Sequence, residues 1–285
     1  MAQAVQVLEL SPFVVRPISP SIGAEIDGID MAMPLDPATL AALRAALLER
    51  KVIFFRDQDI TVEQHMAFGR QFGVLEINPF NPKLPDHPEV IPLNHGPKSR
   101  GRENGWHSDV TWSATPSMGS ILRAVEVPTV GGDTLFADMC AAYDGLSDEV
   151  KAKIDGQVAV HHANHLEKVL RSQGVGEEQV QKTLRENPQV EHPIVRTHPE
   201  TGQKALYVNV AFTKYIVGMD KDASDALLAQ LYAQASIPEY QCRFRWRKNS
   251  VAFWDNRATQ HYAASDYFPA VRRMQRVTIV GDRPF

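Results

Sequence analysis

The sequence predicts an α+β protein, mainly β, built on an antiparallel barrel or a double-sheet jelly roll with flanking helices. Many short runs rich in β-branched and aromatic residues alternate with a few amphipathic helical segments. No internal repeat and no clean linker divides the chain, and 285 residues with 44% apolar composition suffice for a large core. We therefore expect a single domain over residues 1–285.

The first helix and strand are predicted near the N-terminus. Residues 37–50, PATLAALRAALLER, have amphipathic spacing, with Asp36 as N-cap and Pro37 at the first helical position. The next segment, KVIFF at 51–55, is β-branched and aromatic and favours a buried strand.

A second, shorter helix precedes a long irregular segment. Thr61 and Gln64 form a capping-box pattern, and Gly73 closes the helix that follows. Residues 76–106 are rich in Pro, Gly and Asn, which forbids long regular structure apart from a short strand at EVIPL. A loop of this length in a compact domain is usually a lid or a binding loop, so we expect a lid here.

The remainder of the chain reads as strands with helical inserts. Helices are predicted over 147–155, 176–186 and 224–235, and strands over 119–127, 132–138, 203–212, 241–246, 250–256 and 272–280.

Charge and composition exclude several classes of function. The net charge of −4 carries no basic stripe, so nucleic acid is not an expected partner. No apolar run approaches the roughly 20 residues that span a bilayer, and the first residues lack the pattern of a signal peptide. We expect a cytoplasmic protein without a membrane partner. Cys140 and Cys242 are interpreted as two buried thiols rather than a disulfide.

The stretch WHSDVTW, residues 106–112, suggests a metal site. In a strand, His107 and Asp109 would point to one face, and His261 follows the predicted strand SVAFW as a third ligand. Two histidines and one carboxylate on one face of an iron leave open positions, which is the arrangement of non-haem Fe(II) oxygenases.

Other histidines compete for this role. His87 with Glu89 and His198 with Glu200 have the same spacing, but a proline separates each pair in a turn-like context. They are interpreted as turn and surface residues. The cluster HHANH, at 161–165, could place its first and last histidines on one helical face as a zinc pair, but it lacks the glutamate of a metalloprotease. Its histidines are interpreted as structural or lid residues.

Two arginines follow the third candidate ligand. In VRRMQRVTI, Arg272 and Arg276 are four residues apart and share one strand face, whereas Arg273 faces the other way. Two arginines on an inward face are costly unless anions pair with them. A bidentate clamp on a carboxylate is the natural solution.

Taken together, these motifs resemble the TauD/TfdA family of Fe(II)- and 2-oxoglutarate-dependent dioxygenases. The resemblance covers nearly the whole chain and is strongest in NGWHSDVTW, VPTVGGDTLFADM, HPIVRTHPETGQKALYVN and WDNRATQHYAASDY with RRMQRVTIVGDRPF. It implies a double-stranded β-helix core in which His107, Asp109 and His261 hold Fe(II). It also implies that Arg272 grips the far carboxylate of the cosubstrate 2-oxoglutarate, helped by Thr134, and that O2 is consumed.

The resemblance also indicates a substrate pocket. Arg276 matches the position that holds the anionic group of the substrate in the taurine enzymes, and Phe212 matches an aromatic wall. We expect Phe212 and Trp112 to contact the apolar part of the substrate.

Three positions depart from the taurine enzymes. Where those enzymes carry a His and a Tyr in the lid loop, this chain has Asn78 and Asn81, and where they place an Asn before the first ligand it has Glu103. Each lost donor is worth about 1.5–3 kcal/mol when a charged group is bound, so taurine itself is not the expected substrate.

We therefore expect a dioxygenase that hydroxylates a small organic anion, an alkyl or aryl sulfonate or a sulfate ester. The alternative is an aryloxyalkanoate (2,4-D-type) dioxygenase. A catalytically inactive metal-binding barrel is disfavoured because ligands and clamp are retained together, and a zinc hydrolase does not call for paired arginines. A homo-oligomer, dimer or tetramer, is expected.

Overall fold

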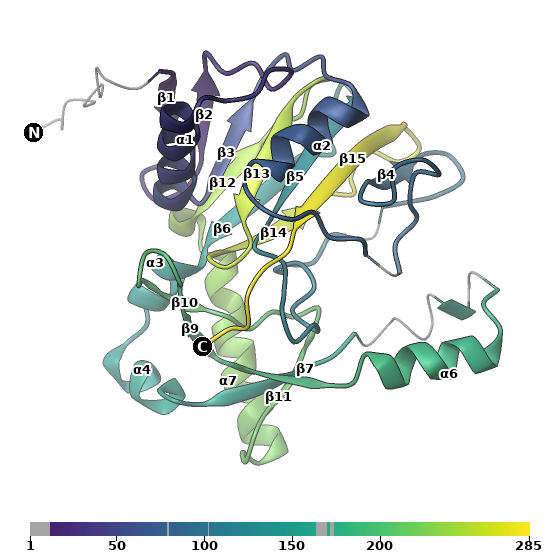
Figure 1. Ribbon diagram of the computed structural model, residues 1–285. Coiled ribbons are helices and arrows are strands. Elements are labelled where there is room, and N and C mark those ends of the chain that lie inside the picture. The colour runs from purple at the N-terminus through teal and green to yellow at the C-terminus, as the bar shows by residue number, and fades with distance from the viewer. Residues whose placement is uncertain (1–11, 79, 102, 164–169, 172–173) are drawn as a thin grey trace, which may run out of the picture.

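The largest element of the fold is a seven-stranded sheet in the order β1-β2-β3-β13-β5-β15-β4 (Figure 1). The computed structural model describes residues 12–78, 80–101, 103–163, 170–171 and 174–285. All neighbouring strands are antiparallel except β2 and β3, which are parallel. In sheet order the strands are β1 (Val14–Pro17), β2 (Ala24–Asp27), β3 (Val52–Phe55), β13 (Val251–Asp255), β5 (Gly119–Glu126), β15 (Arg272–Ile279) and β4 (Ile91–His95).

A three-stranded sheet, β12-β6-β14, packs against one face of the large sheet. Its strands are β12 (Gln241–Phe244), β6 (Thr134–Asp138) and β14 (Thr259–Ala263). Phe136 and Phe244 of the small sheet lie in one apolar cluster with Phe54 and Trp254 of the large sheet, and Phe54 stacks on Phe244 with ring centroids 4.0 Å apart. The space between these two sheets is where the candidate site lies.

Two helices cover the opposite face of the large sheet: α1 (Pro37–Arg50) and α2 (Val62–Arg70). Side chains of β13 alternate, so that Phe253 packs under these helices while Trp254 faces the small sheet. Asp36 caps α1 through the backbone N–H groups of residues 38 and 39, and Thr61 and Gln64 form the predicted capping box of α2.

The remaining elements form a second layer beside the small sheet, in the lower part of Figure 1. A shared apolar cluster joins three of its helices, over residues 139–144, 148–154 and 221–233, to the short sheets, with Leu206, Ile216 and Leu231 among its fully buried members. The helix over 177–186 packs through Val180 in a separate small cluster. The elements are α3 (Met139–Asp144), α4 (Asp148–Ile154), β7 (Val158–His161), α6 (Glu177–Glu186), β8 (Val190–Pro193), β9 (Val195–Thr197), β10 (Lys204–Leu206), β11 (Thr213–Ile216) and α7 (Lys221–Ala233).

The predicted helices at 37–50, 147–155, 176–186 and 224–235 are confirmed within a few residues. The strand predicted over 203–212 is wrong beyond Leu206, because Asn209 and Thr213 form side-chain bonds to a turn there instead of a ladder. The two cysteines are free and buried, as expected. Within the described residues, no helix is long and apolar enough to cross a membrane.

Candidate active site

A cavity of about 260 Å³ opens between the large and the small sheet. Its lining includes every residue that the sequence analysis singled out for metal, cosubstrate and substrate. These are Asn78, Asn81, Glu103, His107, Asp109, Trp112, Thr134, Phe212, His261, Arg272 and Arg276.

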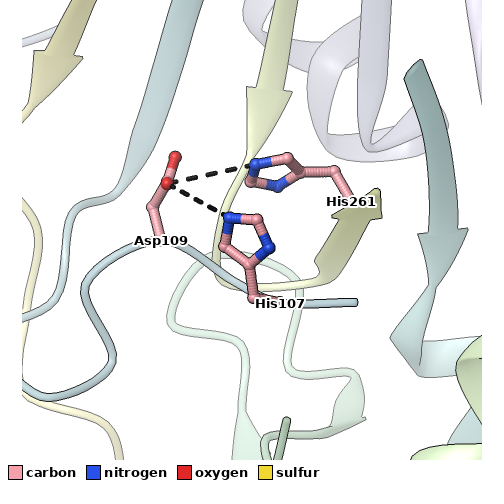
Figure 2. Close-up of side chains that lie close together, drawn as sticks. All are labelled: His107, Asp109 and His261. Carbon is pink, nitrogen blue, oxygen red and sulfur yellow. Dashed lines mark ion pairs between the residues drawn. The ribbon is translucent and has the colours of Figure 1, made fainter. Parts of the chain in front are cut away.

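Two imidazoles and one carboxylate converge in this cavity (Figure 2). The Nε2 atoms of His107 and His261 lie 3.9 and 4.0 Å from Oδ1 of Asp109, and the three donor atoms all lie within 4.8 Å of one another. His107 and His261 also exchange backbone hydrogen bonds of 3.1 and 2.8 Å, which fixes β14 against the segment that carries the other two side chains. One metal ion can reach this donor set, which is that of the two-histidine, one-carboxylate iron sites.

The prediction that His107 and Asp109 lie on a strand is wrong. His107 makes only an isolated bridge, and the chain turns at residues 109–112, where Val110 has a φ of +48°. A left-handed conformation is costly for a β-branched residue, and such strain gathers at functional sites. The turn, rather than the alternation of a strand, aims both side chains into the cavity.

Both imidazoles are in a state that suits metal binding. His107 Nδ1 lies 2.7 Å from the carbonyl oxygen of Gly105, which can only accept, so the proton sits on Nδ1 and Nε2 presents its lone pair to the cavity. Burial and the neighbouring His107 lower the pKa of His261 to about 3, so this ring is neutral and able to ligate.

Asp109 is held as a carboxylate. Burial acts to raise its pKa, but Arg276 and the two imidazoles outweigh this effect and hold the pKa below its usual value. Arg276 Nη1 donates to Oδ1 at 2.9 Å, and the hydroxyl of Ser120 donates to Oδ2 at 3.1 Å. Both oxygens of the carboxylate are therefore oriented by neighbours.

Asn256 also positions Asp109, and the sequence analysis missed it. Its carboxamide accepts from the backbone N–H of Asp109 at 2.6 Å and donates to the Asp109 carbonyl at 2.9 Å and to that of Ser117 at 3.1 Å. The turn is buried and outside any ladder, so its backbone needs such a partner. The motif WDN, with an amide directly after a strand end, is the signal that could have indicated it.

Arg272 is buried and lines the cavity. It is 5% exposed and lies over the rings of Trp246 and Tyr267, and within the described residues its Nε and Nη2 have no hydrogen-bond partner. Burial lowers the pKa of this guanidinium. The indole N–H of Trp246 donates to the Thr134 hydroxyl at 2.9 Å, which leaves the hydroxyl proton of Thr134 for an acceptor in the cavity. A buried cation with unused donors calls for an anion.

Arg276 lies on the same face of β15 as Arg272, as predicted. Both line the cavity, whereas Arg273 is exposed and pairs with Glu126 on the other side. The four-residue spacing therefore does separate two inward guanidinium groups from an outward one.

The outer part of the cavity has an apolar wall. Phe212 is largely buried and meets the His107 ring edge-on, with centroids 6.2 Å apart. Trp112 packs on Phe80 with centroids 5.3 Å apart, in a small cluster with Val180 of α6. Apolar surface thus lies beside the two guanidinium groups.

The three polar positions that differ from the taurine enzymes also line the cavity. Asn78 is buried, and its Oδ1 accepts from the backbone N–H groups of Phe80 and Asn81 at 2.9 and 3.1 Å, so this oxygen shapes the loop. Glu103 lies 3.4 Å from His95 Nε2.

Comparisons with known proteins agree with this geometry of the site. Residues 15–278 match the family described as "Taurine catabolism dioxygenase TauD, TfdA family". The chain belongs to this family. It is 36% identical to an α-ketoglutarate-dependent sulfate ester dioxygenase of Pseudomonas putida over 100% of this chain and 94% of that protein. It is 32% identical to an (S)-phenoxypropionate/α-ketoglutarate dioxygenase of Sphingobium herbicidovorans over 96% of this chain and 97% of that protein. A taurine dioxygenase structure from Burkholderia xenovorans is 41% identical, with a TM-score of 0.82 over 95% of this chain and 92% of that one. The protein is therefore an enzyme, an Fe(II)- and 2-oxoglutarate-dependent dioxygenase.

In this TauD/TfdA-family enzyme the competing His-x-acid pairs lie outside the cavity. His87 pairs with Glu63 at 3.1 Å in a turn, as expected. The interpretation of His198 as a surface residue is wrong, because it is 3% exposed and its Nε2 donates to Asp255 at 2.9 Å. The pairing with a buried carboxylate explains why a histidine is found there.

The histidine cluster does not form the alternative zinc pair on a helix. His161 ends strand β7 rather than lying in a helix, and it is fully buried. His165 lies outside the described residues. The ring nitrogens of His161 lie within hydrogen-bond distance of the Thr111 and Thr213 hydroxyls, which agrees with a structural role.

Proposed function

We propose that this dioxygenase hydroxylates a small organic anion, an alkyl or aryl sulfate ester or a sulfonate. The observation that carries the proposal is the pair of guanidinium groups, Arg272 and Arg276, facing one cavity with the candidate metal ligands. Arg272 binds the cosubstrate 2-oxoglutarate, and Arg276 remains to bind a second anion, the substrate.

In this proposal His107, Asp109 and His261 hold the iron. The bound iron and 2-oxoglutarate supply, with O2, the oxidising power for C–H hydroxylation. The protein positions the reactants. Arg272 clamps the far carboxylate of 2-oxoglutarate through its unused Nε and Nη2 donors, and the Thr134 hydroxyl adds a further bond.

Arg276 binds the anionic group of the substrate. Its Nη1 already donates to Asp109, so the substrate engages the remaining edge of the guanidinium, including Nε, which has no partner within the described residues. Phe212 and Trp112 hold the apolar body, and Asn78, Asn81 and Glu103 of the cavity lining border the substrate. Holding the substrate carbon near the metal in this way is positioning catalysis.

A sulfate ester or sulfonate is favoured by the 36% identity to the sulfate ester dioxygenase over the whole chain. An aryloxyalkanoate is the second candidate. The aromatic pair Phe80 and Trp112 and the 32% identity to the phenoxypropionate enzyme favour it.

Several broader expectations stay predictions. We propose that the chain is one domain whose two facing sheets form a double-stranded β-helix, supported by the core shared between them. We propose that the loops on either side of β4, within residues 76–106, close over bound substrate as a lid, since Asn78, Phe80, Asn81 and Glu103 of these loops line the cavity. A homo-oligomer and a cytoplasmic location also stay predictions.

A succinate-release screen tests the proposal. Enzyme with Fe(II) and 2-oxoglutarate is offered linear alkyl sulfates, alkyl and aryl sulfonates, aryloxy acids and taurine. We expect an apolar anion to exceed taurine in kcat/KM by at least about tenfold, which corresponds to about 1.4 kcal/mol of transition-state binding. Arg276→Ala should lose turnover of that substrate and keep slow, uncoupled decarboxylation of 2-oxoglutarate.

Arg273→Ala is the matched control, because Arg273 lies on the same strand with its side chain exposed. The proposal is wrong if taurine is the best substrate of the panel. It is also wrong if Arg276→Ala turns over the preferred anion as fast as the parent enzyme does.

A further inference from the structure

Four buried polar side chains form a closed hydrogen-bond network behind the metal turn: Thr111, His161, Asn209 and Thr213. Their exposures are 0%, 0%, 1% and 7%. Asn209 Nδ2 donates to Thr111 Oγ1 at 3.0 Å, and Thr111 Oγ1 lies 3.0 Å from His161 Nδ1. Thr213 Oγ1 accepts from the backbone N–H of Asn209 at 2.9 Å and lies 3.4 Å from His161 Nε2.

The donors and acceptors of this network suit a neutral imidazole. The Thr111 hydroxyl accepts from Asn209 and can also donate to or accept from His161 Nδ1, while Thr213 Oγ1 lies 3.4 Å from Nε2 and 3.5 Å from Nδ1 of the same ring. Burial lowers the pKa of His161 to about 3, so the ring is neutral as this arrangement requires. Each of the four side chains therefore has at least one hydrogen-bond partner within the network.

The network joins two segments that are far apart in the sequence. Thr111 lies two residues after Asp109, in the turn that carries two candidate ligands. On the other side, Asn209 Oδ1 accepts from the backbone N–H of Phe212 at 3.0 Å, and the Phe212 carbonyl accepts from His162 N–H at 2.9 Å. Phe212 lines the cavity, and its ring meets that of His107.

We propose that Thr111, His161, Asn209 and Thr213 are positioning residues that hold the metal turn and the Phe212 wall in one fixed arrangement. The network sets the distance between metal and substrate, and so keeps 2-oxoglutarate decarboxylation coupled to substrate hydroxylation. It rests on the ligand assignment of the proposed function, but not on which anion is the substrate. It also gives a role to His161, the first histidine of the HHANH cluster.

The physical reason is the cost of a partly satisfied buried network. Removing one member leaves the others buried without partners, so the segments shift to find new ones. Small displacements of positioned groups strongly reduce turnover, and partners outside the ligand shell typically change metal affinity by about 10–100-fold.

The test compares Thr111→Val, which keeps the shape and loses the hydroxyl, with Thr111→Ser, which keeps the hydroxyl. Two quantities are measured: Co(II) affinity of the metal-free protein, and succinate formed per hexyl sulfate consumed. We expect Thr111→Val and Asn209→Ala each to weaken Co(II) binding about tenfold and to raise the succinate ratio at least twofold. Thr111→Ser should restore both within about twofold of the parent.

The double variant that combines Thr111→Val with Asn209→Ala should lose no more Co(II) affinity, and uncouple no further, than the more affected single variant, because the four residues act as one unit. Ser224→Ala is the control, since its buried hydroxyl also accepts a backbone N–H, from Ile216 at 2.9 Å, outside the cavity lining. It should change neither quantity.

If urea denaturation shows that Thr111→Val is not folded, Thr213→Val tests the same network at its most exposed member. Parental Co(II) affinity and succinate ratio in a folded valine variant would overturn the proposal, as would additive effects in the double variant. If hexyl sulfate is not turned over by the parent, the proposed function is in question, while the Co(II) titration still decides this inference.

Discussion

At the residue scale, the buried guanidinium of Arg272 should decide the requirement for 2-oxoglutarate. Arg272→Ala removes a charged bidentate contact worth about 3 kcal/mol, so we expect the apparent KM for 2-oxoglutarate to rise by more than about 100-fold. Co(II) affinity should stay within threefold or so of the parent, since within the described residues the Nε and Nη2 of Arg272 bond to no metal ligand and metal affinity depends on direct partners. Succinate release against 2-oxoglutarate concentration measures the first effect.

The neighbour Arg273 provides the comparison. Because its side chain is exposed and paired with Glu126, Arg273→Ala should leave the KM for 2-oxoglutarate unchanged. A large rise in KM for Arg273→Ala, with none for Arg272→Ala, would reassign the clamp.

Asn256 acts at the same scale on the metal. Asn256→Ala leaves the buried backbone N–H and carbonyl of Asp109 without their partner, so we expect Co(II) affinity to fall about 10–100-fold. Asn187→Ala is a suitable control, because its amide also bonds a backbone carbonyl, that of Thr183, at the end of α6. Equal Co(II) affinity in the two variants would contradict a positioning role for Asn256.

At the element scale, α2 carries a buried histidine that should make the protein acid-sensitive. His65 is fully buried, with its Nε2 donating to the Ile121 carbonyl at 3.1 Å, and burial lowers its pKa to about 4. The unfolded chain therefore binds the proton more readily than the folded one. Stability from this group is present above pH 6.5 and is lost as the pH falls from 6.5 to about 4.

Urea unfolding of metal-free protein at pH 7 and pH 5 measures this effect. The contribution of His65 should fall by about 2 kcal/mol between these values. His65→Gln keeps a donor for the Ile121 carbonyl but does not titrate. Between pH 7 and pH 5 its free energy of unfolding should therefore fall by about 2 kcal/mol less than that of the parent. Parallel pH profiles of parent and variant would show that His65 is not the cause.

At the scale of the whole molecule, a buried ion network ties α1 to the end of β13. Asp255 is 1% exposed and accepts from Arg257 at 2.9 and 2.7 Å, while Glu200 bridges Arg257 to Arg44 of α1. Among the described residues, Arg257→Met leaves the buried Asp255 with His198 as its one side-chain partner, so the free energy of unfolding should fall by about 3–5 kcal/mol. Arg44→Met, at the exposed end of the same network, should cost less than about 1 kcal/mol. If urea unfolding shows equal losses in the free energy of unfolding for Arg257→Met and Arg44→Met, burial of Asp255 is not the source of the effect.

Local signals in the sequence determined much of this protein. The caps at Asp36 and Thr61, the helical spacing of 37–50 and the four-residue spacing of the inward arginines are each set within one or two turns of chain, so they hold wherever the segment packs. The motif around His107, with the downstream arginines, was also enough to indicate the family and the chemistry.

Only the tertiary structure decided how the site is assembled. The turn at Val110, the burial of His198 against Asp255 and the hydrogen bonds of Asn256 to Asp109 each depend on a partner distant in the chain. Asn256 and Asp109, for example, are 147 residues apart. A buried backbone group must be paired, but which side chain pairs with it depends on how the sheets pack, and a local pattern carries no information about that.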